Sequence, residues 1–527
     1  MPSFARQLAA ERPTEVALRD AHNELTWAEV DASLNRVANG LRRVDLGPAQ
    51  RIAVFAENAV ETALANLSGL LASASVVPVN FHLTAEEVAY ILTDSDARVV
   101  FCDAATLERA IDAAAESNVH LVISWAPAEA VAAAMQAPAV QTGSVRLTTW
   151  QDWLLGNPDE PADESLIPRP NLLYTSGTTG RPKGTPLPPT MFAGGATLAE
   201  HFSALAESPL KPYGNHLVVG PMYHTGPLSG ARLLAAGVCS TILGRFDARE
   251  TLAAIERFEI GSTIMVPTHF VRLLALPEEV RTSFDLNSLK RVSHTGAKCP
   301  VDVKRAMIDW WGPVFVDAYG ASEVGTTCMI ESEDWLRFPG SVGQAVPPFE
   351  AMILDDDNQP VPANTEGQLF FRDQTGRGVV YHNAPEKTAA AHIAPGVFTL
   401  GEIAYMNEEG YVFITDRFSD MVVSGGVNIY PAEAEQVLIE HETVADIACI
   451  GVPHPEMGEE LKALVILEGG VQQSAEHAAT LIAWCRDRLS HYKCPRSVDF
   501  VTDLGRNTMG KVNKRKLKAP YWEGQTA

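Results

Sequence analysis

A segment rich in hydroxyl groups and glycines, residues 172–184, contains the groups that a polyphosphate site needs. It follows an apolar run, and the residues concerned are Thr175, Ser176, Gly177, Thr178, Thr179, Gly180 and Lys183. Glycine lets backbone N–H groups approach a ligand closely, hydroxyls add donors, and the lysine adds positive charge. Surface loops of similar composition are common, but this density with a lysine at the end favours phosphate binding. Gly184 stands where a Walker A loop has Ser or Thr, which excludes that motif.

A second candidate is a carboxylate that follows a predicted strand. The apolar run 314–319 ends at Tyr319, and Gly320, Ala321, Ser322 and Glu323 come directly after it. Open α/β sheets bind their ligands at the carboxyl ends of the strands. We therefore expect Glu323 to lie at a ligand site rather than in an ordinary surface turn.

Two more glycine-containing turns have weaker patterns. Gly425 and Gly426 precede a helix predicted to open at Pro431, which alone is an ordinary cap. The segment ending at Lys511 has the GxxxxGK spacing of a P-loop, but Val512 follows where that motif requires Ser or Thr. A solvated basic tail is the structural alternative for Lys511 and the residues after it.

Alternating strand and helix patterns must position these residues. Apolar runs separated by helical periodicity predict parallel sheets covered by helices, and the runs are 51–55, 76–79, 97–101, 217–219, 262–267 and 291–296. The alanine-rich stretch 104–137 is helical in bias. From about residue 343, short strands between turns predict an antiparallel, barrel-like region. After Arg417 the pattern predicts a small α+β unit.

Taken together, these segments resemble the acyl-adenylate-forming superfamily, which comprises acyl-CoA ligases, peptide-synthetase adenylation domains and luciferases. The motifs occur in the family's order from about Leu173 to Lys511, so the resemblance covers nearly the whole chain. It implies a large N-terminal domain with a small antiparallel β-barrel and a small mobile α+β domain. The expected boundaries are 1–417, including a barrel-like subdomain at about 343–417, and 418–527.

The resemblance also implies roles for individual residues. Tyr319 would stack on adenine, Glu323 would hold Mg²⁺ on the phosphates, and Lys511 would reach the acyl carboxylate and the α-phosphate. His224 would lie beside the acyl carboxylate, although a lone histidine in apolar surroundings is usually structural. Further nucleotide- and substrate-binding positions are Gly296, Ala297, Asp317, Gly320, Ala321 and Ser322.

Some positions depart from the family pattern. Glu402 stands where the family has an Asp that holds both ribose hydroxyls, and Met509 stands where Thr is usual. Arg417 fits a ribose contact. Ser419 occupies the hinge, and the loop with Gly425 and Gly426 would enter the site for thioester formation.

The implied reaction is ATP-dependent formation of an acyl-AMP followed by attack of the CoA thiol, with AMP and pyrophosphate released. The expected substrate is a hydrophobic carboxylic acid, whether fatty, aryl or polycyclic. Two alternatives remain open. One is adenylation with an acceptor other than CoA. The other is a non-catalytic nucleotide-binding relative.

Composition limits the possible partners. The 527 residues have a formal net charge of −24, which argues against non-specific nucleic-acid binding. Seven scattered cysteines without a CxxC pair indicate neither a disulfide framework nor a zinc site. With no apolar run of 18 residues and no signal peptide pattern, we expect a cytoplasmic protein without a transmembrane segment. A peripheral membrane contact and a homodimer are left open.

Overall fold

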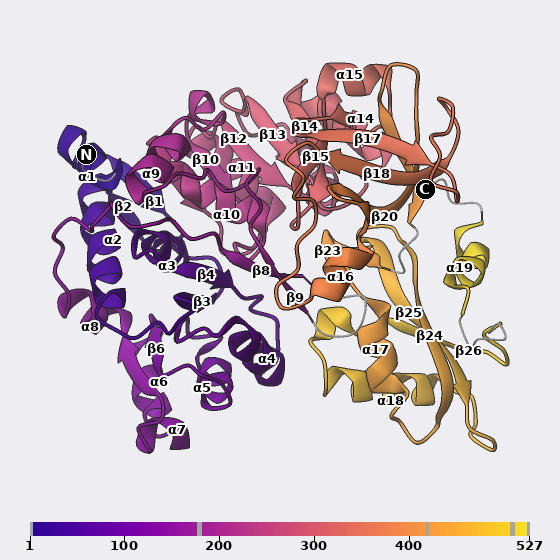
Figure 1. Cartoon of the computed structure of the whole chain (residues 1–527), viewed down its shortest axis with the longest axis horizontal. Coiled ribbons are helices and arrows are strands. Elements are labelled where there is room, and N and C mark those ends of the chain that lie inside the picture. Colours follow the sequence, from indigo (N-terminus) through magenta and orange to yellow (C-terminus); the bar gives the residue numbers. More distant parts are fainter. Residues whose placement is uncertain (1–3, 176–181, 418–420, 506–511, 524–527) are drawn as a thin grey trace.

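Two parallel β-sheets form most of the N-terminal part of the computed structural model, which describes residues 4–175, 182–417, 421–505 and 512–523 (Figure 1). The larger sheet is parallel from β1 to β14, with antiparallel strands at its edges. Its strands, in spatial order, are β16 (Gln344–Ala345), β15 (Gly325–Glu331), β14 (Phe315–Ala321), β13 (Arg291–His294), β12 (Ser262–Met265), β10 (His216–Val218), β11 (Ser240–Ile242), β1 (Val16–Arg19) and β2 (Glu24–Thr26).

The second sheet is parallel throughout. Its order is β4 (Ser75–Pro78), β3 (Arg51–Phe55), β5 (Val99–Cys102), β6 (Leu121–Ser124) and β7 (Arg146–Thr149). Strand β6 falls inside the alanine-rich stretch predicted to be helical, so that prediction was wrong there. All four β6 residues are buried. A parallel strand covered on both faces has no alternating pattern to distinguish it from a buried helix.

Helices cover both faces of these sheets, as predicted. One core cluster contains residues of both sheets, so the helices between them are shared by two layers: α2 (Trp27–Leu41), α3 (Val60–Leu71) and α10 (Thr225–Arg232). The outer faces are covered by α4 (Ala85–Ser95) and α5 (Leu107–Ala115) on the smaller sheet, and by α11 (Ala248–Arg257), α12 (Pro267–Leu274) and α14 (Val301–Trp311) on the larger. The other α-helices of this part are α1 (Phe4–Glu11), α6 (Ala128–Ala134), α7 (Pro138–Gln141), α8 (Trp150–Leu155), α9 (Leu198–Ala206), α13 (Glu278–Arg281), α15 (Ser332–Arg337) and α16 (Pro385–Ala390).

Two antiparallel units complete the N-terminal part. One is a two-stranded hairpin of β8 (Leu172–Thr175) and β9 (Lys183–Pro186). The other is a five-stranded sheet, and a bridge between Gly343 and Val412 brings the segment before it beside its last strand. Its strands are β17 (Phe349–Leu354), β18 (Gly367–Asp373), β20 (Val397–Met406), β19 (His392–Ala394) and β21 (Val412–Arg417).

The C-terminal part, residues 421–523, has its own sheet and core at the lower right of Figure 1. Its strands are β23 (Val427–Ile429), β22 (Val422–Ser424), β25 (Gly458–Leu467), β24 (Val444–His454) and β26 (Ser497–Phe500), of which β26 joins β25 in parallel. The helices are α17 (Pro431–Leu438), α18 (Ala475–Arg486) and α19 (Lys514–Trp522). Among the described residues, no helix has both the length and the apolar character needed to cross a membrane.

Candidate active site

One cavity of about 2210 Å³ gathers residues from every motif that the structure describes. Its wall includes Thr175, His224, Gly296, Ala297, Asp317, Tyr319, Gly320, Ala321, Ser322, Glu323, Glu402, Gly425 and Gly426. These positions come from the hairpin, the carboxyl ends of parallel strands, the antiparallel sheet and the C-terminal part. Residues separated by up to about half of the chain therefore line one cavity.

The hairpin β8–β9 holds the two ends of the glycine- and hydroxyl-rich segment together. Thr175, the last residue of β8, and Lys183, the first of β9, are register partners. The hairpin is anchored from the side, because the N–H of His382 donates to the Gly184 carbonyl at 2.7 Å and Thr185 Oγ1 donates to the Val380 carbonyl at 2.8 Å. The residues between the strands, Ser176, Gly177, Thr178, Thr179 and Gly180, lie outside the described residues.

Glu323 is buried beside this hairpin. Thr175 Oγ1 donates to Glu323 Oε1 at 3.1 Å. Burial raises the pKa of the Glu323 carboxyl, while its own backbone N–H, Thr175 and the Lys183 charge act in the opposite direction. Burial and repulsion from Lys387 lower the pKa of Lys183, whose Nζ lies 5.2 Å from the centre of the Tyr381 ring. A carboxylate and an ammonium thus share a partly desolvated corner, where each strengthens the charged form of the other.

The turn after β14 depends on a close backbone approach. A Cβ atom on Gly320 would lie 2.0 Å from the Gly325 carbonyl oxygen, so no larger residue fits there. The pairing register of β14 and β15 shifts between Tyr319 and Gly320. This irregularity lets the chain turn at the cavity, with Tyr319 on the strand and Glu323 beyond it.

A buried cation lies behind Asp317. Lys304 Nζ on α14 is 3.3 Å from Asp317 Oδ2, and His294 Nε2 is 3.6 Å from the same oxygen. Burial lowers the pKa of His294 to about 4 despite Asp317. The imidazole is therefore neutral near pH 7, and Lys304 compensates the carboxylate. Sequence reasoning missed Lys304, although its position on the face of α14 that also holds Met307 and Ile308 is a usable signal.

Glu402 and Arg417 are register partners on two neighbouring strands. Glu402 is buried on β20, and its register partner on β21 is Arg417. The two candidate ribose-binding positions are thus neighbours, although the side chain of Arg417 lies outside the described residues.

His224 lies at the start of α10, next to Tyr223. Burial, with a smaller contribution from His82, lowers the pKa of His224 to about 4. At neutral pH this side chain is an uncharged hydrogen-bonding group.

The glycine loop of the C-terminal part lies against the large sheet. A Cβ atom on Gly296 would be 3.5 Å from the Gly426 carbonyl oxygen, and one on Gly426 would be 2.9 Å from Val266 Cγ1. Both glycines of the loop, Gly425 and Gly426, have positive φ angles of 60° and 83°. This close approach places the loop in the cavity beside Gly296 and Ala297.

Other predictions fall outside the described residues or concern a metal. Lys511 and Ser419 belong to segments that the structure does not describe. In the described part of the chain, no group of three His, Cys, Asp or Glu side chains could hold a metal ion. Mg²⁺ commonly binds through one or two carboxylates together with substrate phosphates. Glu323, which lies beside the hairpin, fits a site of that kind rather than a site built from protein ligands alone.

Comparison with known proteins identifies the family. The family model for the AMP-binding enzyme matches residues 4–379, and the model for the AMP-binding enzyme C-terminal domain matches residues 433–511. A feruloyl-CoA synthase of Amycolatopsis sp is 32% identical over 97% of this chain and 96% of its own length. A 3-[(3aS,4S,7aS)-7a-methyl-1,5-dioxo-octahydro-1H-inden-4-yl]propanoyl:CoA ligase of Mycobacterium tuberculosis is 32% identical over 98% of both chains.

Solved structures agree over the whole chain. The amide bond synthetase McbA from Marinactinospora thermotolerans has a TM-score of 0.80 at 25% identity, covering 99% of this chain and 100% of its own. A double mutant of the o-succinylbenzoate CoA synthetase from Bacillus subtilis, bound with a product analogue, has a TM-score of 0.77 at 23% identity over 98% of both chains. The two family models and these full-length relatives show that this chain belongs to the AMP-binding enzyme family.

Proposed function

We propose that the protein is an AMP-forming acid–CoA ligase. It converts a hydrophobic carboxylic acid to its acyl-CoA through an acyl-AMP, using ATP and CoA and releasing AMP and pyrophosphate. The observation that supports this most is the single cavity shared by the hairpin of the hydroxyl-rich segment, Glu323, Glu402, His224 and the Gly425–Gly426 loop. Full-length similarity to two CoA ligases supports the acceptor.

The first half-reaction must bring two anions together. A carboxylate oxygen attacks the α-phosphorus of ATP, and the bond to pyrophosphate breaks. Fixed positive charge and N–H dipoles lower the barrier most where they are preorganised. We assign this role to Lys183 with the segment 176–180 and, from its motif, to Lys511. Mg²⁺, when bound at Glu323, would neutralise phosphate charge.

The nucleoside is assigned to the wall built by β13, β14 and β20. We propose that Tyr319 stacks on adenine and that Gly296, Ala297, Asp317 and Ser322 line its pocket. Lys304 holds Asp317 in place from behind. Glu402 and Arg417 are paired across β20 and β21. Glu402 would accept hydrogen bonds from the ribose hydroxyls, and Arg417 would donate a hydrogen bond to the ribose. Glu402 is one methylene longer than the Asp that is usual in the family. Its register pairing with Arg417 keeps the two positions next to each other.

The second half-reaction is assigned to the C-terminal part. The CoA sulfur bonds to the acyl carbon, the carbon–oxygen bond to AMP breaks, and the thiol proton passes to solvent. We propose that this part moves about Ser419 between the two half-reactions. A division at residues 417 and 418 is supported by β21, which ends the antiparallel sheet at Arg417, and by β22, which begins the next sheet at Val422.

The acid is proposed to be aryl or polycyclic rather than a short polar acid. His224, Gly320 and Ala321 line the cavity together with apolar side chains such as Val266 and Ile264. A neutral His224 can contact a ring of the substrate or donate one hydrogen bond to it, and it places no charge next to apolar side chains. The named activities of the two CoA ligase relatives agree with a bulky ring acid.

The test is CoA-thiol consumption with ATP and Mg²⁺ over a panel of fatty, aryl and polycyclic acids, with pyrophosphate measured in parallel. Equal loss of thiol and gain of pyrophosphate is expected for at least one acid. Pyrophosphate without thiol loss would favour a different acceptor, an alternative supported by the likeness to an amide bond synthetase. Absence of both thiol loss and pyrophosphate release with every acid would favour the non-catalytic alternative.

Cellular context completes the proposal. We expect a cytoplasmic enzyme with small-molecule partners and no nucleic acid. All seven cysteines are free thiols, in keeping with a reducing compartment. The predictions of a homodimer and of peripheral membrane contact are tested by sedimentation analysis and by vesicle co-sedimentation.

A further inference from the structure

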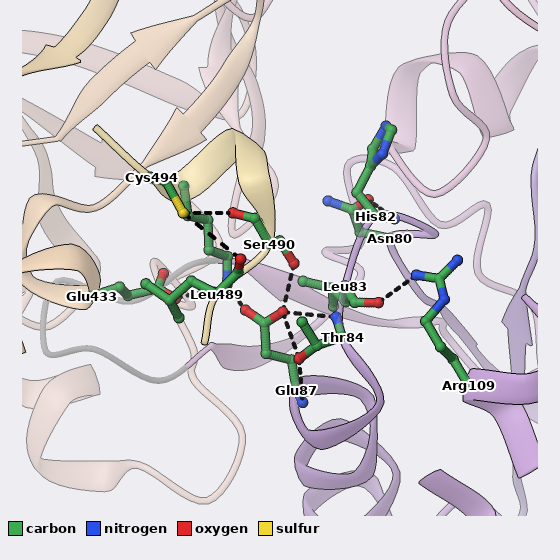
Figure 2. Close-up of polar contacts among 11 residues, drawn as sticks. Asn80, His82, Leu83, Thr84, Glu87, Arg109, Glu433, Leu489, Ser490 and Cys494 are labelled. Atoms are coloured by element: carbon green, nitrogen blue, oxygen red, sulfur yellow. Dashed lines mark hydrogen bonds and ion pairs between the residues drawn. The ribbon is translucent and has the colours of Figure 1, made fainter. Parts of the chain in front are cut away.

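A buried ion-pair cluster joins the two parts of the molecule (Figure 2). Lys493 Nζ lies 2.8 Å from Glu87 Oε1 and 2.7 Å from Glu433 Oε2. Ser490 Oγ donates to Glu87 Oε2 at 2.5 Å. The side chains of Lys493, Glu87 and Glu433 are only 2%, 12% and 3% exposed. We call these four residues the Lys493 cluster.

We propose that Glu87 and Lys493 are positioning residues that hold the C-terminal part where the Gly425–Gly426 loop reaches Gly296. They would support transfer of the acyl group to CoA and contribute little to formation of the acyl-AMP. The inference rests on the proposed function, since it needs two half-reactions. Neither residue belongs to the motifs that assign the nucleotide and acyl sites.

The distribution of the cluster over the chain gives the first argument. Glu87 lies on α4 of the N-terminal part, whereas Glu433, Ser490 and Lys493 all lie in the C-terminal part. Figure 2 shows Glu87 pointing out of the start of α4 toward the turn that contains Ser490. Movement of the C-terminal part therefore separates Glu87 from three partners that stay together.

The electrostatics favour this docked arrangement. Burial alone would raise the pKa of Glu87, but the Lys493 charge and hydrogen bonds from Lys493, Ser490 and Thr84 lower it below its ordinary value. Burial raises the pKa of Glu433, whose Oε1 makes no hydrogen bond to the described residues. Lys493 is thus shared by two carboxylates, and removing its charge would leave both buried without a cation.

Each partner keeps a second contact when the parts separate. Glu87 Oε2 accepts from the Thr84 N–H at 2.9 Å and from Thr84 Oγ1 at 3.1 Å, because it completes the capping box of α4. Lys493 keeps Glu433. Since neither charge is left alone, the contact can open and close repeatedly, as a two-step reaction requires.

The neighbour of Lys493 connects the cluster to the cavity. Tyr492 packs against the core of the C-terminal part and also against the core beneath α4. Its ring centre is 6.2 Å from that of His82, and Tyr492, His82, Tyr223 and His224 all line the cavity. Docking at Lys493 therefore shapes the wall beside the proposed acyl site.

The decisive variant is Glu87→Gln, because Gln preserves the capping box and removes the charge. The matched control is Glu29→Gln, since Glu29 completes an equivalent capping box with Thr26 on α2 but contacts no residue of the C-terminal part among its hydrogen bonds. Both are assayed with the acid that gives the fastest turnover in the panel. Pyrophosphate release without CoA measures adenylation, and thioester formed when CoA is added to preformed acyl-AMP measures transfer.

We expect Glu87→Gln to slow transfer about tenfold or more and to change adenylation less than about twofold, with Glu29→Gln near wild type in both. Glu87→Asp, which keeps the charge, should recover part of the transfer rate. Equal slowing of both steps, or an unchanged transfer rate in a folded variant, would overturn the inference. Absence of pyrophosphate release from the wild type with every acid would instead count against the proposed function.

A second substitution guards against a folding defect. Lys493→Gln should reproduce the selective loss of transfer if docking is the role of the pair. Melting of the N-terminal part, followed by tryptophan fluorescence, should stay close to that of the wild type. A selective loss of adenylation in this variant would contradict the assignment.

Discussion

Among the residues that the structure describes, two ion pairs cross between the N-terminal and C-terminal parts, and they differ in burial rather than in length. Arg272 Nε on α12 lies 2.6 Å from Glu456 Oε1, slightly closer than Lys493 lies to Glu87. However, the Arg272 and Glu456 side chains are 43% and 44% exposed, against 2% and 12% in the buried pair. Exposed pairs contribute little because water and salt screen them, whereas breaking a buried pair leaves a charge without solvent. The comparison indicates that the burial of the side chains, rather than the distance between the charged atoms, determines which pair holds the two parts together.

The largest effect is expected from Lys493→Met. The change leaves Glu87 and Glu433 buried together without a cation, and breaking such a pair costs about 3–5 kcal/mol. The acyl-transfer rate should fall at least about tenfold at pH 8 and recover partly toward pH 6, because two close carboxylates raise each other's pKa and can share a proton. Single-turnover transfer over this pH range measures it. Lys462→Met, which breaks the Lys462–Asp499 pair within the C-terminal sheet, is the control.

Double-mutant cycles should separate the two pairs quantitatively. With Gln at both positions, the coupling between Glu87 and Lys493 should be about 1.5 kcal/mol or more in the transfer step. The coupling between Arg272 and Glu456 should lie at about 0.2–1 kcal/mol. Equal couplings would show that burial does not distinguish the pairs.

Salt should affect only the exposed pair. Between about 0.1 M and 1 M salt the Debye length falls from about 10 Å to about 3 Å. The coupling between Arg272 and Glu456 should therefore shrink, while that between Glu87 and Lys493 should change little. The same cycles repeated at both salt concentrations provide the measurement, and loss of both couplings would contradict the buried character of the Lys493 cluster.

The smallest effect is expected from Glu456→Gln alone. The hydrogen bond from Arg272 lowers the pKa of Glu456, so the carboxylate is charged at neutral pH, but both partners remain hydrated when the pair is broken. We expect less than about a twofold change in transfer at neutral pH. A steady-state assay with CoA as the varied substrate is sufficient, and a tenfold loss would reverse the order of the two pairs.

Much of the fold follows from local sequence patterns. The predicted strand at 51–55 matches β3, because a short run that contains Ile, Val and Phe favours a strand. The resemblance to the acyl-adenylate-forming superfamily assigns Thr175, Glu323 and Glu402 to one nucleotide site, and all three line one cavity.

Other features have a weak local signal or none. Strand β6 lies among alanines and gives no signal of its own, whereas Lys304 shares a helix face with Met307 and Ile308, a signal that a lysine obscures. The capping box of Thr84 and Glu87 is visible in the sequence, but its contact to Ser490 joins residues 403 positions apart. Pairings of that range are set by tertiary docking, which periodicity and propensity do not encode.

The hairpin β8–β9 has a consequence for how tightly the phosphate segment is held before a nucleotide arrives. Its two strands belong to no larger sheet, so anchors such as those at Gly184 and Thr185 hold it in place of a continuous ladder of strands. Opening of this hairpin therefore requires less free energy than opening of the buried sheets beside it. The amide hydrogens of the hairpin should exchange with solvent early. When a ligand occupies the cavity, slower exchange should be detected first at the residues next to Thr175 and Lys183.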